Sequence, residues 1–174
     1  YVLRDVDALL RESQDGAHRV KEIIQALRSF ARADEGERVE VNVNEGIEAT
    51  LKVVWNEIKY KCKLEKRLAP VPTVPGYPGQ LNQVFLNLIL NAAQAIPEKG
   101  EIAVETAVEA GHVVVRVSDT GVGIPPENLP KLFSPFFTTK PVGQGTGLGL
   151  SISYNIVRRH HGPIEVRSEV GRGT

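Results

Sequence analysis

Residues 143–150 read Gly-Gln-Gly-Thr-Gly-Leu-Gly-Leu, with a glycine at every second position. This run directly opens a helix that we expect from Gly147 to about His161. Glycines at a helix N-terminus expose backbone N–H groups, and these donors together with the helix dipole suit an anion such as phosphate. A flexible hinge is the alternative interpretation, but the four alternating glycines exceed what a hinge needs.

The glycine run differs from two common phosphate-binding motifs. No lysine follows the glycines, so the run is not a Walker loop. Leu150 stands where the last glycine of the dinucleotide-binding pattern should be. The run therefore predicts an anion site of some other class.

Residues 119–146, which include the start of the run, are predicted to form a long loop rich in proline and glycine. Structureless loops of this length are unusual in a compact domain and are commonly lids or binding loops. It begins with Asp119-Thr120-Gly121-Val122-Gly123 at a predicted strand end, where a carboxylate can face an amine and the glycines allow close approach. Taken alone, this start is better explained as a turn that caps the strand.

A long helix is expected from Pro78 to Ala95, because its apolar residues recur at helical spacing and Pro97 and Gly100 follow. Asn87 and Asn91 lie four residues apart, so both amides project from the same face. Asparagine carbonyls are hard oxygen donors suited to Mg²⁺. A buried polar contact is the alternative, but two asparagines inside an apolar helix are costly unless satisfied, which favours a ligand.

The remaining pattern alternates strands with helices. The expected elements are a strand at 39–43, a helix capped by Asn44 and running to about Tyr60, a strand at 62–68, a proline-rich loop at 70–78, a hairpin of 101–108 with 112–118, and a strand at 164–168. One hairpin without a strict strand-helix-strand rhythm predicts an α+β fold. We expect a two-layer sandwich with a mixed sheet covered on one face by helices.

Apolar or small residues recur at steps of three and four through residues 1–32. They are Leu3, Val6, Leu10, Ser13, Ala17, Val20, Ile24, Leu27 and Ala31. The pattern predicts a long amphipathic helix with one buried stripe. This helix could fold onto its own domain, but the regular repeat favours self-association into a bundle, and hence a homodimer. The polar stretch 33–38 is then a linker, and 39–174 is the second domain.

The composition argues against several classes of partner and compartment. Lysine plus arginine balance aspartate plus glutamate at 21 each, so no net field favours nucleic acid or an anionic membrane. The single cysteine, Cys62, cannot form an internal disulfide, which fits a cytoplasmic setting. No apolar run reaches the length of a membrane span and no signal peptide is present, so we expect any inner-membrane anchor to lie outside this sequence. The chain has no methionine and is expected to be part of a longer protein.

The order of the motifs is more specific than any one of them. After the asparagine helix and the Asp-x-Gly-x-Gly strand end come Leu-Phe-Ser-Pro-Phe-Phe-Thr-Thr-Lys at 132–140, the glycine run, and Gly-Arg-Gly-Thr at 171–174. Over roughly residues 39–174 this order resembles the ATP-binding catalytic domain of sensor histidine kinases. That superfamily also includes gyrase, a heat-shock chaperone and a mismatch-repair ATPase, and the resemblance implies their Bergerat-type fold.

The same resemblance implies a role for each matched residue. Asp119 would accept a hydrogen bond from the adenine amine, and Asn91 would hold a Mg²⁺ ion at the ATP phosphates with support from Asn87. Residues 124–146 would form a lid whose Lys140 carries positive charge to the phosphates. Other residues expected at the ATP or as the lid's apolar anchor are Gln94, Gly121, Gly123, Ile124, Phe133, Phe136, Phe137, Gly145, Thr146, Gly147, Leu148, Gly149, Leu150 and Thr174. Helix 1–32 resembles the second helix of the family's dimerisation and phosphotransfer domain, and a terminal strand would lie beyond Thr174.

Two departures from the family pattern affect the expected chemistry. Three residues after Asn91 many members place a lysine that reaches phosphate, whereas this chain has Gln94, so charge neutralisation there is weaker or falls to Lys140. The family's phosphoacceptor histidine, which is followed by an acidic residue, is missing, because His18 is followed by Arg19. The acceptor would therefore lie outside this chain, which would not phosphorylate itself alone.

These residues favour a kinase over a hydrolase. In the hydrolysing relatives a glutamate four residues before the metal asparagine activates water, and Asn87 cannot act as that base. We expect transfer of the ATP γ-phosphate to a histidine outside this chain and then to an aspartate of a response regulator, with negligible hydrolysis. The alternatives are a dimeric ATP-binding signalling module without phosphotransfer and a serine-directed kinase of the same fold.

Overall fold

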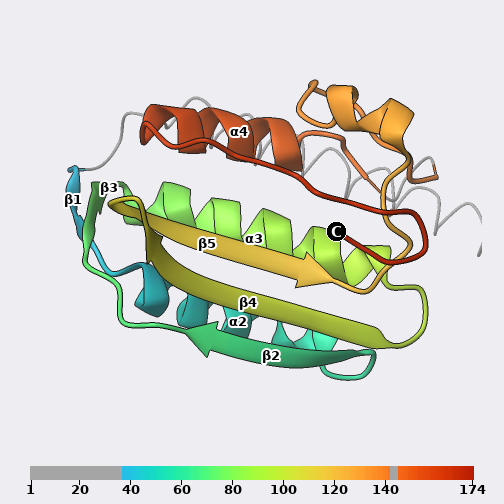
Figure 1. Cartoon of the computed structure of the whole chain (residues 1–174), viewed down its shortest axis with the longest axis horizontal. Coiled ribbons are helices and arrows are strands. Elements are labelled where there is room, and N and C mark those ends of the chain that lie inside the picture. Colours follow the sequence, from blue (N-terminus) through green and yellow to red (C-terminus); the bar gives the residue numbers. More distant parts are fainter. Residues whose placement is uncertain (1–36, 142–144) are drawn as a thin grey trace, which may run out of the picture.

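The computed structural model describes residues 37–141 and 145–174, which form two layers (Figure 1). The sheet contains β2 (Cys62–Leu68), β4 (Gly100–Glu109) and β5 (His112–Asp119). The helices are α2 (Val43–Ile58), α3 (Pro78–Ala95) and α4 (Gly149–Arg159), with a short 3₁₀ helix η1 (Pro126–Lys131) in the long loop. Two further strands, β1 (Val39–Val41) and β3 (Val74–Gly76), form a separate small ribbon.

The three-stranded sheet is mixed, as expected from the sequence. The central strand β4 pairs in parallel with β2, with Cys62 opposite Gly100, and antiparallel with β5. Ala110 and Gly111 form the tight turn of the β4–β5 hairpin with φ angles of 48° and 80°. The hairpin register places Asp119 opposite Ile102, so the acidic residue lies at the open end of the sheet.

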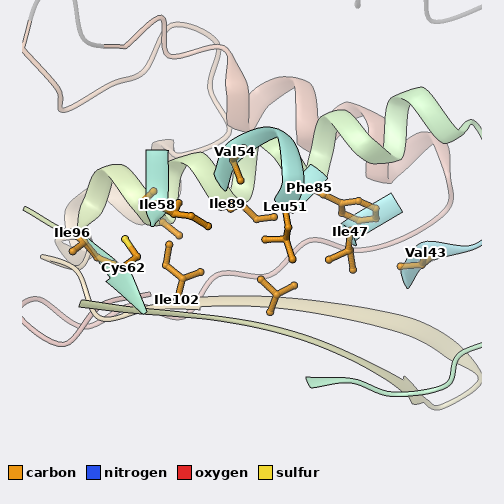
Figure 2. Packing of buried hydrophobic residues seen from close by; sticks show 13 residues of the cluster. Val43, Ile47, Leu51, Val54, Ile58, Cys62, Phe85, Ile89, Ile96 and Ile102 are labelled. Atoms are coloured by element: carbon orange, nitrogen blue, oxygen red, sulfur yellow. The ribbon is translucent and has the colours of Figure 1, made fainter. Parts of the chain in front are cut away.

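The hydrophobic core lies between this sheet and the helices α2 and α3, as Figure 2 shows. The buried side chains along α2 follow steps of three and four and include Ile47, Leu51, Val54 and Ile58. Burying each such side chain stabilises the fold by about 1.5–3 kcal/mol. The outward face of the sheet instead carries ion pairs between strands, such as Lys63 Nζ to Glu101 Oε1 at 2.9 Å. One buried face and one solvated face confirm the predicted two-layer α+β architecture.

The start of α2 corrects one expectation, because Asn42 and not Asn44 is the N-cap. The Asn42 Oδ1 accepts a hydrogen bond from the Glu45 N–H at 3.3 Å, and its Nδ2 donates to Glu45 Oε1 at 2.9 Å. Starting the helix here buries Val43. Asn44 then donates to the Ala69 carbonyl at 2.8 Å and accepts from Thr106 Oγ1 at 2.9 Å, which ties α2 to the sheet.

Two other expectations about the elements are wrong. The loop predicted at 70–78 contains β3, whose Val74 pairs with Val41 of β1. No strand within the described residues includes 164–168; side-chain burial alternates there, but the chain makes only an isolated bridge between Glu169 and Gly173. Alternating burial predicts the face that a side chain takes, whereas a strand also needs a partner edge that supplies hydrogen bonds.

The helix after the glycine run begins at Gly149 and not at Gly147. Gly147 has a φ of +66°, which lies outside the helical region, so the helix starts two residues later than expected. The predicted helix at 1–32 with its homodimer interface, His18, and residues 33–36 of the predicted linker lie outside the described residues. No helix within 37–141 or 145–174 has both the length and the hydropathy needed to cross a membrane.

His160 at the end of α4 ties the helix layer together. Its Nδ1 donates to the Ile156 carbonyl at 2.8 Å, and its Nε2 accepts the Tyr77 N–H at 3.1 Å. The ring also packs edge-to-face on Tyr77 at a centroid distance of 5.7 Å. His160 therefore joins the end of α4 to the start of α3.

We predict that His160→Ala lowers the free energy of unfolding by about 1–3 kcal/mol, because the Tyr77 N–H loses a half-buried acceptor. The measurement is the midpoint of urea denaturation. His161→Asn is the matched control, because His161 is exposed with a φ of 60° that asparagine tolerates. The control is expected to change the same free energy by less than about 0.5 kcal/mol. Equal losses in the two variants would contradict the role given to His160.

Candidate nucleotide-binding site

Asp119, at the end of β5, is held in a fixed orientation. Its backbone N–H donates to the Thr174 carbonyl at 2.8 Å, and its Oδ1 accepts the Gly121 N–H at 2.8 Å. The residue is half-buried. Burial raises the pKa of the Asp119 carboxyl, while hydrogen bonds from the backbone of Gly121 and Thr174 act in the opposite direction. A further donor brought to this carboxylate would favour its charged form in the same way.

The two glycines after Asp119 allow segments of backbone to pack closely. A Cβ atom at Gly121 would lie 2.5 Å from the Ala95 carbonyl oxygen at the end of α3. A Cβ at Gly123, whose φ is +71°, would lie 2.2 Å from the Glu169 carbonyl oxygen. Both glycines therefore join the end of β5 to neighbouring backbone, and their contact with a bound base stays a prediction.

A shallow, solvent-open cavity of about 380 Å³ lies beside Asp119. It is lined by Asp119, Arg167, Ser168, Glu169, Arg172, Gly173 and Thr174. The structure thus places the predicted residues Asp119 and Thr174 at the wall of one hollow, and their contact with a nucleotide stays a prediction.

Sequence reasoning missed Ser168, which organises the wall of this cavity. Its hydroxyl accepts the Ile124 N–H at 2.8 Å and donates to the Gly173 carbonyl at 2.9 Å, and it lies 3.0 Å from Thr174 Oγ1. Ser168 therefore connects the start of the predicted lid with the end of the described chain. The sequence carried no signal for this role, because a serine in an alternating segment is ordinary.

The two asparagines of α3 have different partners. Asn87 Nδ2 donates to the Gly149 carbonyl at 2.9 Å and to Ser153 Oγ at 3.1 Å, and its Oδ1 accepts from Gln83 Nε2 at 3.1 Å. Asn87 thus fastens α3 to the first turn of α4. Asn91 Oδ1 instead accepts a hydrogen bond from Lys140 Nζ at 3.3 Å. The support of a metal ion by Asn87 stays a prediction.

The first turn of α4 presents the backbone donors that the glycine run predicted. No side chain caps this helix at its N-cap residue, Leu148. Thr146 Oγ1 accepts the Leu148 N–H at 3.4 Å, and Asn87 holds the carbonyl of Gly149. The helix start is thus fixed in place, and it has the dipole and the N–H groups that suit an anion. Gly145 precedes this turn and Leu150 lies within it, and both residues are half-buried.

The predicted lid is anchored by some of its expected residues and not by others. Phe133 packs on Tyr154 of α4 with ring centroids 5.0 Å apart, and Leu132 beside it is buried. Phe136 does not share the anchoring role, because its side chain is 70% exposed. It has a φ of 66°, and its backbone lies against Gly147, where a Cβ would come within 2.3 Å of the Phe136 carbonyl carbon. Close backbone contact, not ring burial, holds the lid at Phe136.

Lys140 brings a positive charge from the lid to α3. Its ammonium donates to Asn91 Oδ1 at 3.3 Å and to Gln94 Oε1. The Asn91 oxygen thus already accepts a hydrogen bond from a positively charged group. A hard cation such as Mg²⁺ also prefers oxygen ligands of this kind. No cluster of three or more His, Cys, Asp or Glu side chains among the described residues could hold a metal ion. An ion at this place would need the Asn91 oxygen together with the oxygens of a ligand.

The chain is similar to known signalling proteins. The family profile described as "Histidine kinase-, DNA gyrase B-, and HSP90-like ATPase" matches residues 76–174. The chain is 38% identical to the Sensor kinase CckA of Brucella abortus over 181 residues, which cover 92% of this chain and 19% of that protein. It spans about a fifth of the length of the curated relatives it matches.

Solved structures are similar as well. Full-length ShkA in complex with AMPPNP superposes with a TM-score of 0.78 at 26% identity, covering 98% of this chain and 36% of that one. Histidine kinase ThkA in complex with response regulator protein TrrA gives a TM-score of 0.66 at 28% identity, covering 84% of this chain and 43% of that one. With its motifs, its two-layer fold and a profile match over more than half its length, the chain belongs to the histidine kinase-, DNA gyrase B- and HSP90-like ATPase family.

Proposed function

We propose that this chain is the ATP-binding catalytic domain of a sensor histidine kinase. It transfers the γ-phosphate of ATP to a histidine of the same protein outside residues 1–174, and the phosphate then passes to an aspartate of a response regulator. The observation that carries the proposal is the half-buried Asp119 carboxylate, fixed by the Gly121 N–H at the wall of a cavity of about 380 Å³. An acceptor of this kind suits the exocyclic amine of adenine.

Different residues bind the two ends of the ATP molecule. Asp119 orients the base, and the N–H groups at the start of α4 together with Lys140 attract the triphosphate. Asn91 would hold Mg²⁺, which neutralises charge on the phosphates when bound. Phosphoryl transfer depends mostly on positioning and charge stabilisation, so the domain needs an acceptor brought in line with the γ-phosphate and no covalent chemistry of its own.

Hydrolysis is disfavoured by the way Asn87 is held. Its amide nitrogen donates to Gly149 and Ser153, and an amide cannot take a proton from water at neutral pH. At position 87 a hydrolase needs a general base, whereas in this chain Asn87 links α3 to α4. We therefore expect bound ATP to be hydrolysed slowly when no acceptor histidine is present.

The proposed partners are a second copy of the chain and a response regulator. The dimer would form through the helix at residues 1–32, whose heptad pattern supports self-association. The ThkA complex with TrrA supports a response regulator partner. Cys62 is buried and is the single cysteine of the sequence, in keeping with the reducing cytoplasm that we propose as the setting.

The proposed function is tested by adding an acceptor. The chain is expressed with the upstream dimerisation segment of its own protein and incubated with radiolabelled ATP and Mg²⁺. We expect label on one histidine of the added segment, and we expect the chain alone to release inorganic phosphate at a rate close to the uncatalysed background. Rapid phosphate release without labelled histidine would contradict the proposal and would identify an ATPase instead.

A further inference from the structure

The lid and α3 meet at a polar cluster made of Lys140, Asn91 and Gln94. The lysine ammonium donates to the amide oxygens of both α3 residues. Asn91 and Gln94 are three residues apart on the helix, so their side chains are neighbours on one face. Gln94 itself is exposed, and nothing about the packing of α3 requires an amide at this position. We therefore look for the role of the Gln94 amide at the ligand site and not in the packing of the core.

Lys140 is held at this position by the neighbouring chain as well. Its backbone N–H donates to Thr138 Oγ1 at 3.2 Å. A Cβ at Gly145 would lie 2.9 Å from Thr138 Oγ1 and 3.1 Å from Lys140 Cδ, so the absence of a side chain there makes room for the lysine stem. A long exposed lysine normally keeps much rotamer freedom, which makes isolated surface contacts weak. The turn at Thr138 and the space at Gly145 restrict the lysine side chain, so less conformational entropy is lost when it forms these contacts.

We propose that Gln94 is a positioning residue that holds Lys140 beside Asn91, so that the lid and not α3 supplies the cation for the triphosphate. This inference rests on the proposed function and deepens it. A neutral amide oxygen at position 94 attracts the lysine ammonium through a charge-assisted hydrogen bond. A lysine at the same position would repel it, because two ammonium groups would then share one site. Gln94 and Lys140 thus form a matched pair.

The pairing has a consequence for the free protein. The lysine ammonium donates a hydrogen bond to Asn91 Oδ1, the oxygen proposed to hold Mg²⁺. A metal ion that takes this oxygen removes one partner of Lys140, while Gln94 continues to hold the lysine next to the arriving phosphates. One positive charge is therefore present at the site before and after the ligand binds, and the lid stays attached to α3 throughout.

The first test measures the lid in the free protein. We expect Gln94→Ala and Lys140→Gln each to raise hydrogen exchange of the amides at 138–140 by about threefold or more, because each removes the same contact. The double variant with both substitutions is expected to exchange no faster than either single one, as for two partners of one interaction. Unchanged exchange in Gln94→Ala would overturn the proposal.

The second test exchanges the two side chains and measures binding of Mg²⁺-ATP by calorimetry. Lys140→Gln is expected to weaken binding by about tenfold, since the triphosphate loses a cation. The exchange variant Gln94→Lys with Lys140→Gln restores a cation at the cluster and is expected to bind within about threefold of the parent chain. Lys131→Gln, which removes an exposed lysine elsewhere in the lid, is the control and is expected to bind like the parent.

The outcomes separate this inference from the proposed function. If the parent chain binds Mg²⁺-ATP but the exchange variant stays as weak as Lys140→Gln, the pairing of Gln94 with Lys140 is wrong and the ATP site stands. If the parent chain binds no nucleotide, the proposed function fails, and the exchange measurements at 138–140 still decide whether Gln94 holds the lid. Exchange that rises in both single variants, followed by restored binding, supports the inference.

Discussion

Asp119→Asn is expected to weaken ATP binding by about a hundredfold, which corresponds to about 2.7 kcal/mol. The carboxylate is half-buried and fixed by the Gly121 N–H, so it offers an acceptor where the adenine amine offers a donor. Asparagine can present an N–H to that amine, and two opposed donors at a partly desolvated position are strongly unfavourable. The measurement is a calorimetric titration of each protein with ATP in the presence of Mg²⁺.

Lys140→Ala is the comparison for this variant. It is expected to lose only about tenfold in affinity, because the N–H groups at the start of α4 continue to attract the phosphates. Equal losses in the two variants would remove Asp119 from its role at the adenine.

The same carboxylate gives the site a pH dependence. Because burial raises the pKa of Asp119, the group takes up its proton at a higher pH than an ordinary aspartate. The cost of burying its charge is relieved as the pH falls, so this group's contribution to stability becomes more favourable toward low pH. ATP affinity moves in the opposite direction, since a protonated carboxyl is a poorer acceptor for the adenine amine. The parent chain should therefore lose ATP affinity as the pH falls through this pKa, and Asp119→Asn should not.

Gly123→Ala is expected to destabilise the fold by about 2–4 kcal/mol and to weaken ATP binding by more than about tenfold. Two effects add at this position. The φ of +71° costs an L-residue about 1–2 kcal/mol, and the new Cβ would lie 2.2 Å from the Glu169 carbonyl oxygen. The chain around Glu169 must then move, and it carries Ser168 and Thr174 of the cavity wall with it. Urea denaturation and nucleotide titration measure the two losses.

Gly171→Ala separates the strain from the collision. Gly171 has a φ of +80°, close to that of Gly123, but a Cβ there meets no atom within 4 Å. The substitution should cost only the backbone strain, about 1–2 kcal/mol, and should leave ATP affinity within about threefold of the parent. If the two alanine variants lose equal stability and equal affinity, the packing of Gly123 against Glu169 does not shape the site.

The sequence predicted the elements whose patterns are strong over many residues. Helical spacing from Pro78 to Ala95 gave α3 with the bounds that the structure has, and the turn at Ala110 and Gly111 gave the β4–β5 hairpin. These elements depend on the turn and helix preferences of neighbouring residues and on the burial of one face, and both can be recognised from a short stretch of sequence. The family resemblance predicts that the motifs surround one bound nucleotide, and the structure places two of the predicted residues, Asp119 and Thr174, at one pocket.

The errors come from choices that depend on distant partners. Asn42 and Asn44 are equally good caps in isolation, and the burial of Val43 decides between them. The strand β3 exists because Val74 finds Val41, whereas the segment 164–168 finds no partner edge. The prolines at 70–78 predicted a loop and the alternation at 164–168 predicted a strand, and neither local pattern shows whether a partner edge is present.

The candidate site residues show the same division. Asp119 and the glycines around α4 were predictable because a charged residue and a glycine run stand out in sequence. Ser168 was not, since its role depends on three hydrogen bonds to segments far away in the chain. The contact of Lys140 with Gln94 joins residues 46 positions apart, and only the folded lid brings them together.

The central claim is that adenine lies against Asp119 while the triphosphate lies between the start of α4 and Asn91. A crystal structure of this chain with Mg²⁺ and a non-hydrolysable ATP analogue tests it most directly. We predict the adenine amine within hydrogen-bonding distance of the Asp119 carboxylate and the metal ion on Asn91 Oδ1. A cavity beside Asp119 that stays closed by side chains, or an analogue that binds elsewhere on the protein, would contradict the account.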